Sequence, residues 1–175
     1  MGAVAQGIVG VGGEVEMVRL ADLAISPCIG CGGCTKTGRC VIKDDMQSLY
    51  DKVDVASAVI IASPVYFYAL SAQMKIFIDR LQALWSRKQL LSRKGQWTPD
   101  ARRKGYLISV AATQGAKLFV GAQLCAEYAF DAIGLGYGRD FLVRGVDKRG
   151  EVGALTAKIK EAELFGQALC RVAMG

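Results

Sequence analysis

The chain contains no histidine in its 175 residues. Catalytic pairs that use histidine, histidine-ligated metals and imidazole proton relays are therefore excluded. Prolines number only three, and no low-complexity tract or internal repeat is visible. The composition, 52% hydrophobic and 22% charged, is typical of a globular protein. These features predict a single domain over residues 1–175 whose chemistry does not depend on imidazole.

A continuous membrane-spanning segment is also absent from the sequence. The stretch from Val55 to Met74 is uncharged, but Pro64 splits it and polar residues punctuate it, whereas a spanning helix needs roughly 20 apolar residues in a row. The first 13 residues contain five glycines and no basic residue, unlike a signal peptide. We therefore expect no membrane segment and a cytoplasmic protein.

Acidic residues are outnumbered by basic ones, 16 to 22, which gives a net charge of +6. Seven basic residues fall between Arg87 and Lys104, opposed only by Asp100. This concentration favours a solvated connecting segment, and the alternative is a docking patch for an acidic electron donor. We expect no nucleic-acid partner, because neither a regular basic helix nor an RNA-binding signature accompanies the patch.

Segments of strand and helix character alternate along the chain. The run AVIIA at 58–62 is typical of a parallel strand buried on both faces. Further strands are predicted at 15–20, 106–110 and 141–146, and helices at 45–52, 72–85, 119–133 and 152–172, with the last turns of another helix at 3–11. This alternation predicts an α/β fold with a doubly wound parallel sheet.

Ligands of such sheets bind beyond the carboxyl ends of the strands, near the point where strand order reverses. Two segments occupy that position. Ser63-Pro64-Val65-Tyr66-Phe67-Tyr68 follows one predicted strand, and Ala111-Ala112-Thr113-Gln114-Gly115 follows another. We therefore expect a cofactor between them.

Four of the six cysteines, Cys28, Cys31, Cys34 and Cys40, crowd into 13 residues with the spacing C-x2-C-x2-C-x5-C. A cytosolic chain keeps its thiols reduced, so a disulfide framework does not explain the cluster. Thiolates that converge from a glycine-rich loop, about 27–44 here, suit a [4Fe–4S] cluster. Structural zinc is the main rival, although zinc sites usually pair two short knuckles across a longer gap, and metal-free thiols are the third possibility. The other two, Cys125 and Cys170, are predicted to be buried small apolar residues.

Two blocks carry a family resemblance: CIGCGGCTKTGRCVIKDDM, residues 28–46, and SPVYFYALSAQMKIFIDR, residues 63–80. They resemble the iron–sulfur flavoproteins, which belong to the flavodoxin-like NAD(P)H-dependent FMN reductases. The likeness extends from about residue 14 to the end of the chain.

The resemblance implies one FMN per subunit, a [4Fe–4S] cluster on the four cysteines, and a homodimer or homotetramer. Electrons from a ferredoxin-like or nicotinamide donor would pass between cluster and flavin to a small acceptor. Carried over onto this chain, the flavin contacts are Ser63, Pro64, Val65, Tyr66 and Phe67 on one edge of the ring, and Thr113, Gln114 and Gly115 on the other. No residue is assigned as a side-chain nucleophile. Tyr66 and Tyr68 are candidate proton donors or packing residues.

Two departures from the family pattern stand out. Tyr68 occupies a position where the family has a small residue, usually glycine. Family members also begin with a strand and a phosphate-binding loop, whereas here Met1 falls inside the helix that follows that loop. The glycine-rich segment from Gly7 to Gly13 does not replace the phosphate-binding loop, because no strand precedes it.

The family strand order is 2-1-3-4-5, and the first strand is the one that this chain lacks. We therefore expect a gap in the sheet, an inward shift of the 15–20 strand, or another chain in that place. FMN affinity should be weakened accordingly, and we expect the chain to be truncated at its front.

Three functions remain open: an electron-transfer flavoprotein, an FMN or quinone reductase without a cluster, and a non-catalytic module stabilised by metal. The first is favoured by the two motifs together.

Overall fold

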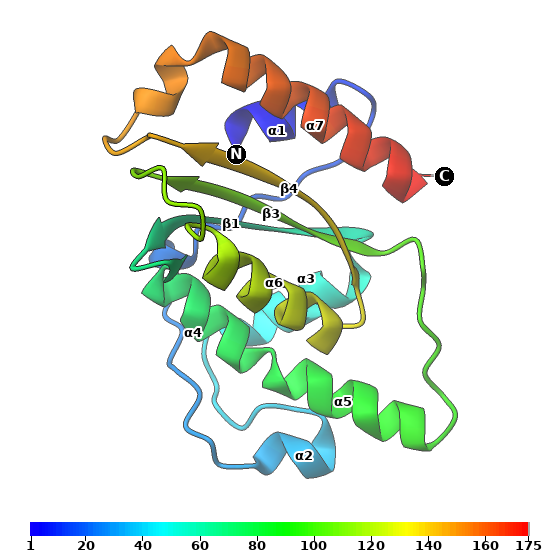
Figure 1. Cartoon of the computed structure of the whole chain (residues 1–175). Coiled ribbons are helices and arrows are strands. Elements are labelled where there is room, and N and C mark those ends of the chain that lie inside the picture. Colours follow the sequence, from blue (N-terminus) through cyan, green and yellow to red (C-terminus); the bar gives the residue numbers. More distant parts are fainter. Residues whose placement is uncertain (175) are drawn as a thin grey trace.

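Four strands form one sheet in the computed structural model, which describes residues 1–174 and leaves Gly175, the last residue of the predicted domain, outside the described residues (Figure 1). The order is β2-β1-β3-β4, with β1 at Ala58–Tyr66, β2 at Ala69–Leu70, β3 at Lys104–Ala111 and β4 at Gly136–Arg144. β1, β3 and β4 are parallel, in a register that pairs Ala58 with Lys104 and Lys104 with Gly136. The short β2 runs antiparallel to the end of β1. The parallel α/β expectation is confirmed for the three long strands.

Helices cover both faces of the sheet. One face carries α1 (Gly2–Val9) and α7 (Thr156–Met174), and the other carries α3 (Met46–Val55), α4 (Ala72–Arg80), α5 (Gln82–Arg93) and α6 (Val120–Ala132) (Figure 1). Side chains alternate along β3 accordingly: Tyr106 and Ile108 enter the core under α1 and α7, while Leu107 enters the core under α3 to α6. Burial on both faces explains the uncharged run at 106–110.

The packing of α1 on α7 depends on glycine. A Cβ at Gly7 would lie 2.0 Å from the carbonyl oxygen of Glu163, and one at Gly166 would lie 2.1 Å from that of Val4. Both distances are far below van der Waals contact, so the two backbones approach only because these positions carry no side chain.

The predicted strand at 15–20 does not form, and this expectation was wrong. The segment is extended but has no ladder, and a short 3₁₀ helix follows at Leu20–Asp22. Met17 is 61% exposed, and within residues 1–174 β1 pairs only with β3 and, at its end, with β2. Without a hydrogen-bonded neighbour an extended segment cannot become a strand. Within residues 1–174 the 15–20 segment has therefore not shifted inward, and β1 has no parallel neighbour on the side away from β3.

The helix predicted at 72–85 is divided at Leu81, which closes a 3₁₀-type bond of 3.0 Å from its N–H to the carbonyl of Ile78. α4 ends and α5 begins there, so the single-helix expectation is corrected. The other predicted helices and strands are found with shifted ends: β1 continues through the Ser-Pro-Val-Tyr segment, β4 begins at Gly136, and a 3₁₀ turn at Glu151–Ala154 precedes α7. No helix within residues 1–174 combines the length and apolarity needed to cross a membrane.

Candidate functional site

The cysteine-rich loop lies outside the sheet, below α5 in Figure 1, and a buried ion pair closes it at its base. Arg80 ends α4, and its Nη1 donates to Asp44 Oδ2 at 2.7 Å and to the Ser26 carbonyl at 2.8 Å, while its Nη2 donates to Asp44 Oδ1 at 3.0 Å. Asp44 in turn accepts the Ser26 N–H at 2.9 Å. Because Ser26 precedes the first cysteine and Asp44 follows the last, this ion pair fixes both ends of the loop to α4.

The ionisation of this pair follows from its surroundings. The side chain of Arg80 is fully buried and that of Asp44 is 9% exposed. The guanidinium of Arg80 lowers the pKa of Asp44 below its ordinary value. Burial would lower the pKa of Arg80, but the hydrogen bond to Asp44 opposes this and the pKa is raised on balance, so the pair stays charged.

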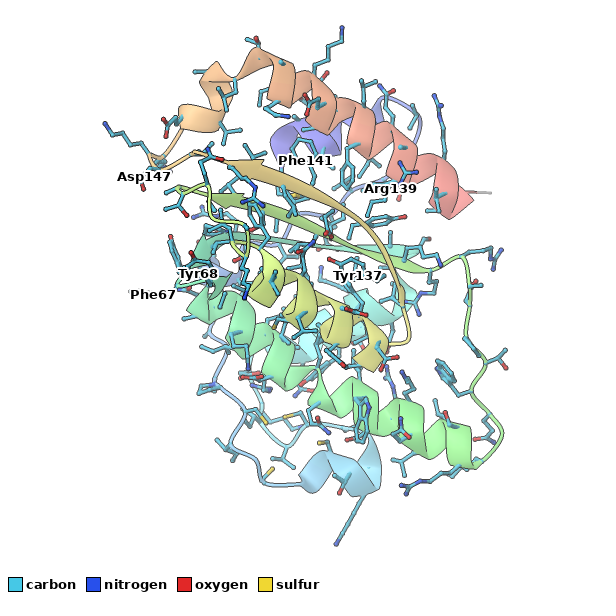
Figure 2. All side chains as sticks on the ribbon, in the orientation of Figure 1. Phe67, Tyr68, Tyr137, Arg139, Phe141 and Asp147 are labelled. Atoms are coloured by element: carbon cyan, nitrogen blue, oxygen red, sulfur yellow. The ribbon has the colours of Figure 1, made fainter. Side chains whose placement is uncertain are left out.

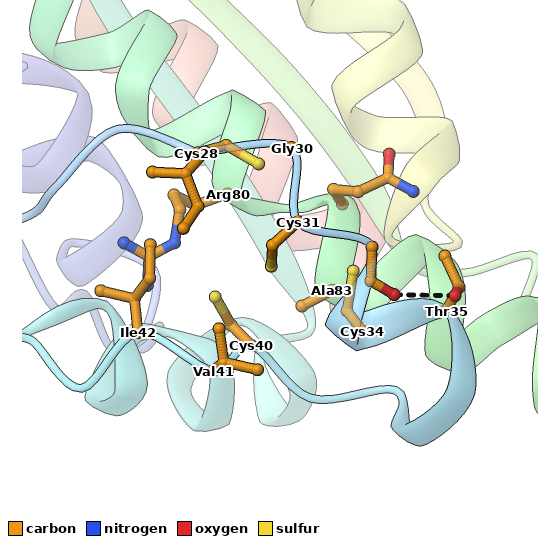
Figure 3. Close-up of a pocket in the computed structure, with 13 residues that line it drawn as sticks. Cys28, Gly30, Cys31, Cys34, Thr35, Cys40, Val41, Ile42, Arg80 and Ala83 are labelled. Atoms are coloured by element: carbon orange, nitrogen blue, oxygen red, sulfur yellow. Dashed lines mark hydrogen bonds between the residues drawn. The ribbon is translucent and has the colours of Figure 1, made fainter.

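All four cysteines of the loop line one pocket of about 240 Å³ (Figure 3). The other lining residues are mostly apolar or glycine, and Arg80 is the charged one: Ile29, Gly30, Gly32, Thr35, Val41, Ile42, Arg80, Gln82 and Ala83. The volume is several times the ~30 Å³ that one water molecule occupies. The four cysteines that the sequence singled out thus face a common space, and their assignment as cluster ligands stays a prediction.

A five-residue helix, α2 (Gly33–Thr37), lies in the middle of the loop and carries Cys34. Its N-cap Gly32 and C-cap Gly38 have φ of 70° and 68°, the left-handed region that glycine adopts without strain. The helix brings Cys34 against α5, where the buried Ser86 hydroxyl donates to Cys34 Sγ at 3.5 Å.

The four thiols differ in their access to solvent. Cys28 and Cys31 are exposed, Cys34 and Cys40 are half-buried, and no cysteine in the described part of the chain forms a disulfide. Within residues 1–174 no three histidine, cysteine, aspartate or glutamate side chains are gathered closely enough to hold a single metal ion. The thiols therefore share a pocket without converging on one point.

The two remaining cysteines sit on helices, as predicted. Cys170 on α7 is buried, which matches the expected small apolar role. Cys125 on α6 is half-buried, and burial raises the pKa of its thiol. Neither lies in the pocket of the other four.

The residues expected to contact a flavin lie at the ends of two neighbouring strands. Pro64 in β1 is in register with Val110 in β3, so the segments that follow emerge at the same edge of the sheet. Tyr66, Phe67, Thr113 and Gln114 are exposed there. Figure 2 places Phe67 and Tyr68 at this edge, on the same side of the molecule as Asp147, which follows β4. Tyr66, Phe67, Thr113 and Gln114 thus form an exposed surface at the ends of β1 and β3, which we name the ledge.

Ser63, Pro64, Gln114 and Gly115 of the expected flavin set also make hydrogen bonds within the chain. The Ser63 hydroxyl donates to the Pro64 carbonyl at 2.9 Å and accepts the Ser71 N–H at 3.0 Å, so it ties β1 to the start of α4. Pro64 has no N–H to donate. The backbone carbonyls of Gln114 and Gly115 accept from Arg144 Nη1, which fixes the loop after β3.

A strained turn joins β1 to β2. Tyr66 pairs with Ala69, so Phe67 and Tyr68 form a two-residue turn, and both have positive φ, 49° and 64°. This turn type strongly prefers asparagine and glycine, because a side chain at positive φ clashes with the backbone. The side chain of Tyr68 lies over Gly115, where an added Cβ would be 3.1 Å from the tyrosine oxygen. A glycine at position 68, which the family motif usually has, would relieve the backbone strain of the positive φ.

The basic segment from Arg87 to Lys104 makes contacts within the chain. Arg87 pairs with Asp54, and Lys88 lies 5.4 Å from the centre of the Trp97 ring. Arg103 donates to the carbonyls of Val53 and Ala56 at the end of α3, and Arg102 pairs with Asp100. These contacts support the interpretation as a connecting segment more than the docking patch.

Solved structures share the fold of this chain. A flavone reductase superposes with a TM-score of 0.68 at 16% identity, covering 98% of this chain and 56% of its own. The Trp repressor binding protein from Bacillus subtilis superposes with a TM-score of 0.60 at 19% identity, covering 92% and 87%. The chain therefore has a flavodoxin-like α/β fold.

The sequence narrows this class to one family. The profile of the NADPH-dependent FMN reductases matches residues 2–130, so the chain belongs to that family. An iron–sulfur flavoprotein of Archaeoglobus fulgidus is 45% identical over 84 residues, 48% of this chain and 38% of the relative. An iron–sulfur flavoprotein of Methanocaldococcus jannaschii is 42% identical over 82 residues, 47% and 42% of the two chains. The matches thus span less than half of each of these relatives.

Proposed function

We propose that this chain is an electron-transfer flavoprotein that holds a [4Fe–4S] cluster on Cys28, Cys31, Cys34 and Cys40 and an FMN at the ends of β1 and β3. The observation that carries the proposal is the pocket itself: all four thiols line it, and a fixed loop base holds it against α4 and α5. Similarity to iron–sulfur flavoproteins supports the same assignment.

A cluster and a zinc ion require different spacings of their cysteine ligands. Four sulfurs around one tetrahedral zinc lie roughly 3.8 Å apart, since each is about 2.3 Å from the metal. The thiols here line a pocket without being gathered around a single ion. An iron–sulfur cube binds each cysteine at a different corner and so requires a more open set of ligands.

An FMN ring fits the ledge because the groups there are unobstructed. Tyr66 and Phe67 are 61% and 103% exposed, and the side chains of Thr113 and Gln114 also face solvent. The turn at Phe67 and Tyr68 presents an aromatic surface on which a planar ring can pack. The proposed contacts lie along the edge of the ring, at the ends of β1 and β3.

When bound, the two groups supply one-electron transfer and flavin chemistry. The chain's own contribution is to hold and insulate them. The Arg80–Asp44 pair fixes the loop base, the buried Ala83 excludes water from part of the pocket, and Cys28 and Cys31 are exposed. A ferredoxin-like or nicotinamide donor, a small acceptor and a homodimer or homotetramer complete the proposal.

The test is metal and flavin analysis of protein purified without oxygen. We expect about four irons and four sulfides per chain, and yellow flavin bands if FMN is retained. Cys34→Ser should lose most of the iron and sulfide while the far-UV circular dichroism is unchanged, because the loop lies outside the sheet. Cys125→Ser is the matched control, a half-buried cysteine away from the pocket that should keep the full content.

A colourless preparation with one zinc per chain would contradict the cluster assignment and favour a metal-stabilised module. Bound FMN with no iron would favour an FMN or quinone reductase without a cluster. Full iron and sulfide in Cys34→Ser would refute the ligand set.

A further inference from the structure

Two buried polar side chains lie beside the cysteines and take no part in the ligand set: Arg80 of α4 lines the pocket, and Ser86 of α5 contacts Cys34. We propose that Arg80 and Ser86 donate hydrogen bonds to the sulfurs of the cluster and raise its reduction potential. This inference rests on the proposed function, since it requires a cluster on the four cysteines.

Ser86 is the more direct case. It is 2% exposed, and its hydroxyl donates to Cys34 Sγ at 3.5 Å, within the range for a hydrogen bond to sulfur. The amide of Gln82, one turn earlier on α5, donates to the same hydroxyl oxygen at 3.4 Å. With its oxygen occupied as an acceptor, Ser86 has its proton free to point at the sulfur. When Cys34 becomes a thiolate ligand, this bond strengthens because its acceptor is then charged.

Arg80 provides the second donor. Its two Nη atoms are used by Asp44 and Ser26, but Nε is buried and is the one buried side-chain nitrogen or oxygen within residues 1–174 that has no hydrogen-bond partner. A buried N–H without a partner destabilises the fold, so an acceptor is expected near it. Arg80 lines the cysteine pocket, and Figure 3 shows it beside Cys28 and Ile42, at the rim of the space that the four thiols surround. A cluster sulfur is the acceptor that this position offers.

The sign of the effect follows from charge. Reduction adds an electron to the cluster, and a hydrogen-bond donor stabilises the more negative, reduced form. Because Asp44 balances the charge at the far end of the guanidinium, the Nε–H bond contributes more than the net charge of Arg80. Ser86 lies beside the half-buried Cys34, whereas Arg80 lies beside the exposed Cys28. Removing either donor should therefore lower the potential.

Ser86→Ala tests the first donor by a redox titration of the cluster signal followed by electron paramagnetic resonance. We expect the midpoint to fall by about a tenfold change in the reduction equilibrium, which is about 59 mV for one electron. Ser86→Thr retains the hydroxyl and should restore most of the potential. Ser92→Ala, an exposed serine on the same helix, should leave the midpoint unchanged.

Arg80→Lys tests the second donor, because lysine keeps the positive charge for Asp44 but has no Nε–H to offer. We expect a fall in the midpoint similar to that of Ser86→Ala, with iron and sulfide contents near those of the unmodified protein. Unchanged midpoints in both Ser86→Ala and Arg80→Lys, with the cluster intact, would overturn this inference and leave the proposed function standing. An unmodified protein without iron and sulfide would refute both. If one of the two variants loses its cluster, the midpoint of the other variant decides the inference.

Discussion

The ion pair at the base of the cysteine loop gives the sharpest test of the structure, and it needs no bound cofactor. Asp44→Ala removes two hydrogen bonds from Arg80, at 2.7 and 3.0 Å, and the acceptor of the Ser26 N–H. Arg80 is then left buried, with the Ser26 carbonyl as its one remaining acceptor. Breaking a buried ion pair by removing one partner costs about 3–5 kcal/mol. We expect a loss near the lower end, about 3 kcal/mol, because the Ser26 contact remains.

Urea unfolding of the apo protein, followed by circular dichroism, measures this loss. With a slope of about 2 kcal/mol per molar urea, the midpoint should fall by about 1.5 M. Asp79→Ala is the control, since Asp79 pairs with Lys75 on the same helix but both side chains are about half exposed. That pair should contribute no more than about 0.5 kcal/mol. Equal losses in the two variants would show that the Arg80–Asp44 pair does not stabilise the loop base.

The Arg80–Asp44 ion pair should also make the stability of the fold depend on pH. The pKa of Asp44 is lowered in the folded state, by Arg80 above all, so the unfolded chain takes up the proton more readily. The stabilisation is therefore present above the ordinary pKa of 3.8 and is lost as the pH falls through the lower, folded value. Asp44→Asn keeps the size of the side chain and should flatten this part of the acid unfolding curve. An unchanged curve would contradict the assignment of the ionised pair.

Three further variants test the fold. Tyr68→Gly should stabilise the chain by up to about 1 kcal/mol in urea unfolding, because glycine accepts a φ of 64° without strain, and a loss of stability would refute the strain. Gly166→Ala should cost about 3 kcal/mol, since its Cβ would lie 2.1 Å from a backbone oxygen of α1, whereas Gly153→Ala meets open space and should be neutral. Arg103→Ala should lower the free energy of unfolding by about 2 kcal/mol, because it removes two hydrogen bonds to carbonyls at the end of α3. Arg102 is exposed, so Arg102→Ala should lower the melting temperature much less, and an equal fall in the two variants would refute this reasoning.

Local pattern in the sequence was enough to predict most of the fold. The uncharged runs at 58–62 and 106–110 predicted β1 and β3, because a strand buried on both faces leaves no place for charge. The segment at 15–20 looked equally like a strand and failed, since strand formation requires a neighbouring strand that no local pattern encodes. The break at Leu81 was also missed: leucine is a good helix former, and the local geometry there depends on packing.

The sequence by itself determined the chemistry available to this protein: four closely spaced cysteines, glycines that permit their loop, and no histidine. The tertiary structure decided what surrounds those thiols. Arg80, Asp44 and Ser86 lie up to 54 positions from their partners, and nothing in their spacing marks them as neighbours of the loop. They meet there because α4 and α5 pack under the sheet and carry buried polar groups to the pocket, which is a consequence of the whole fold.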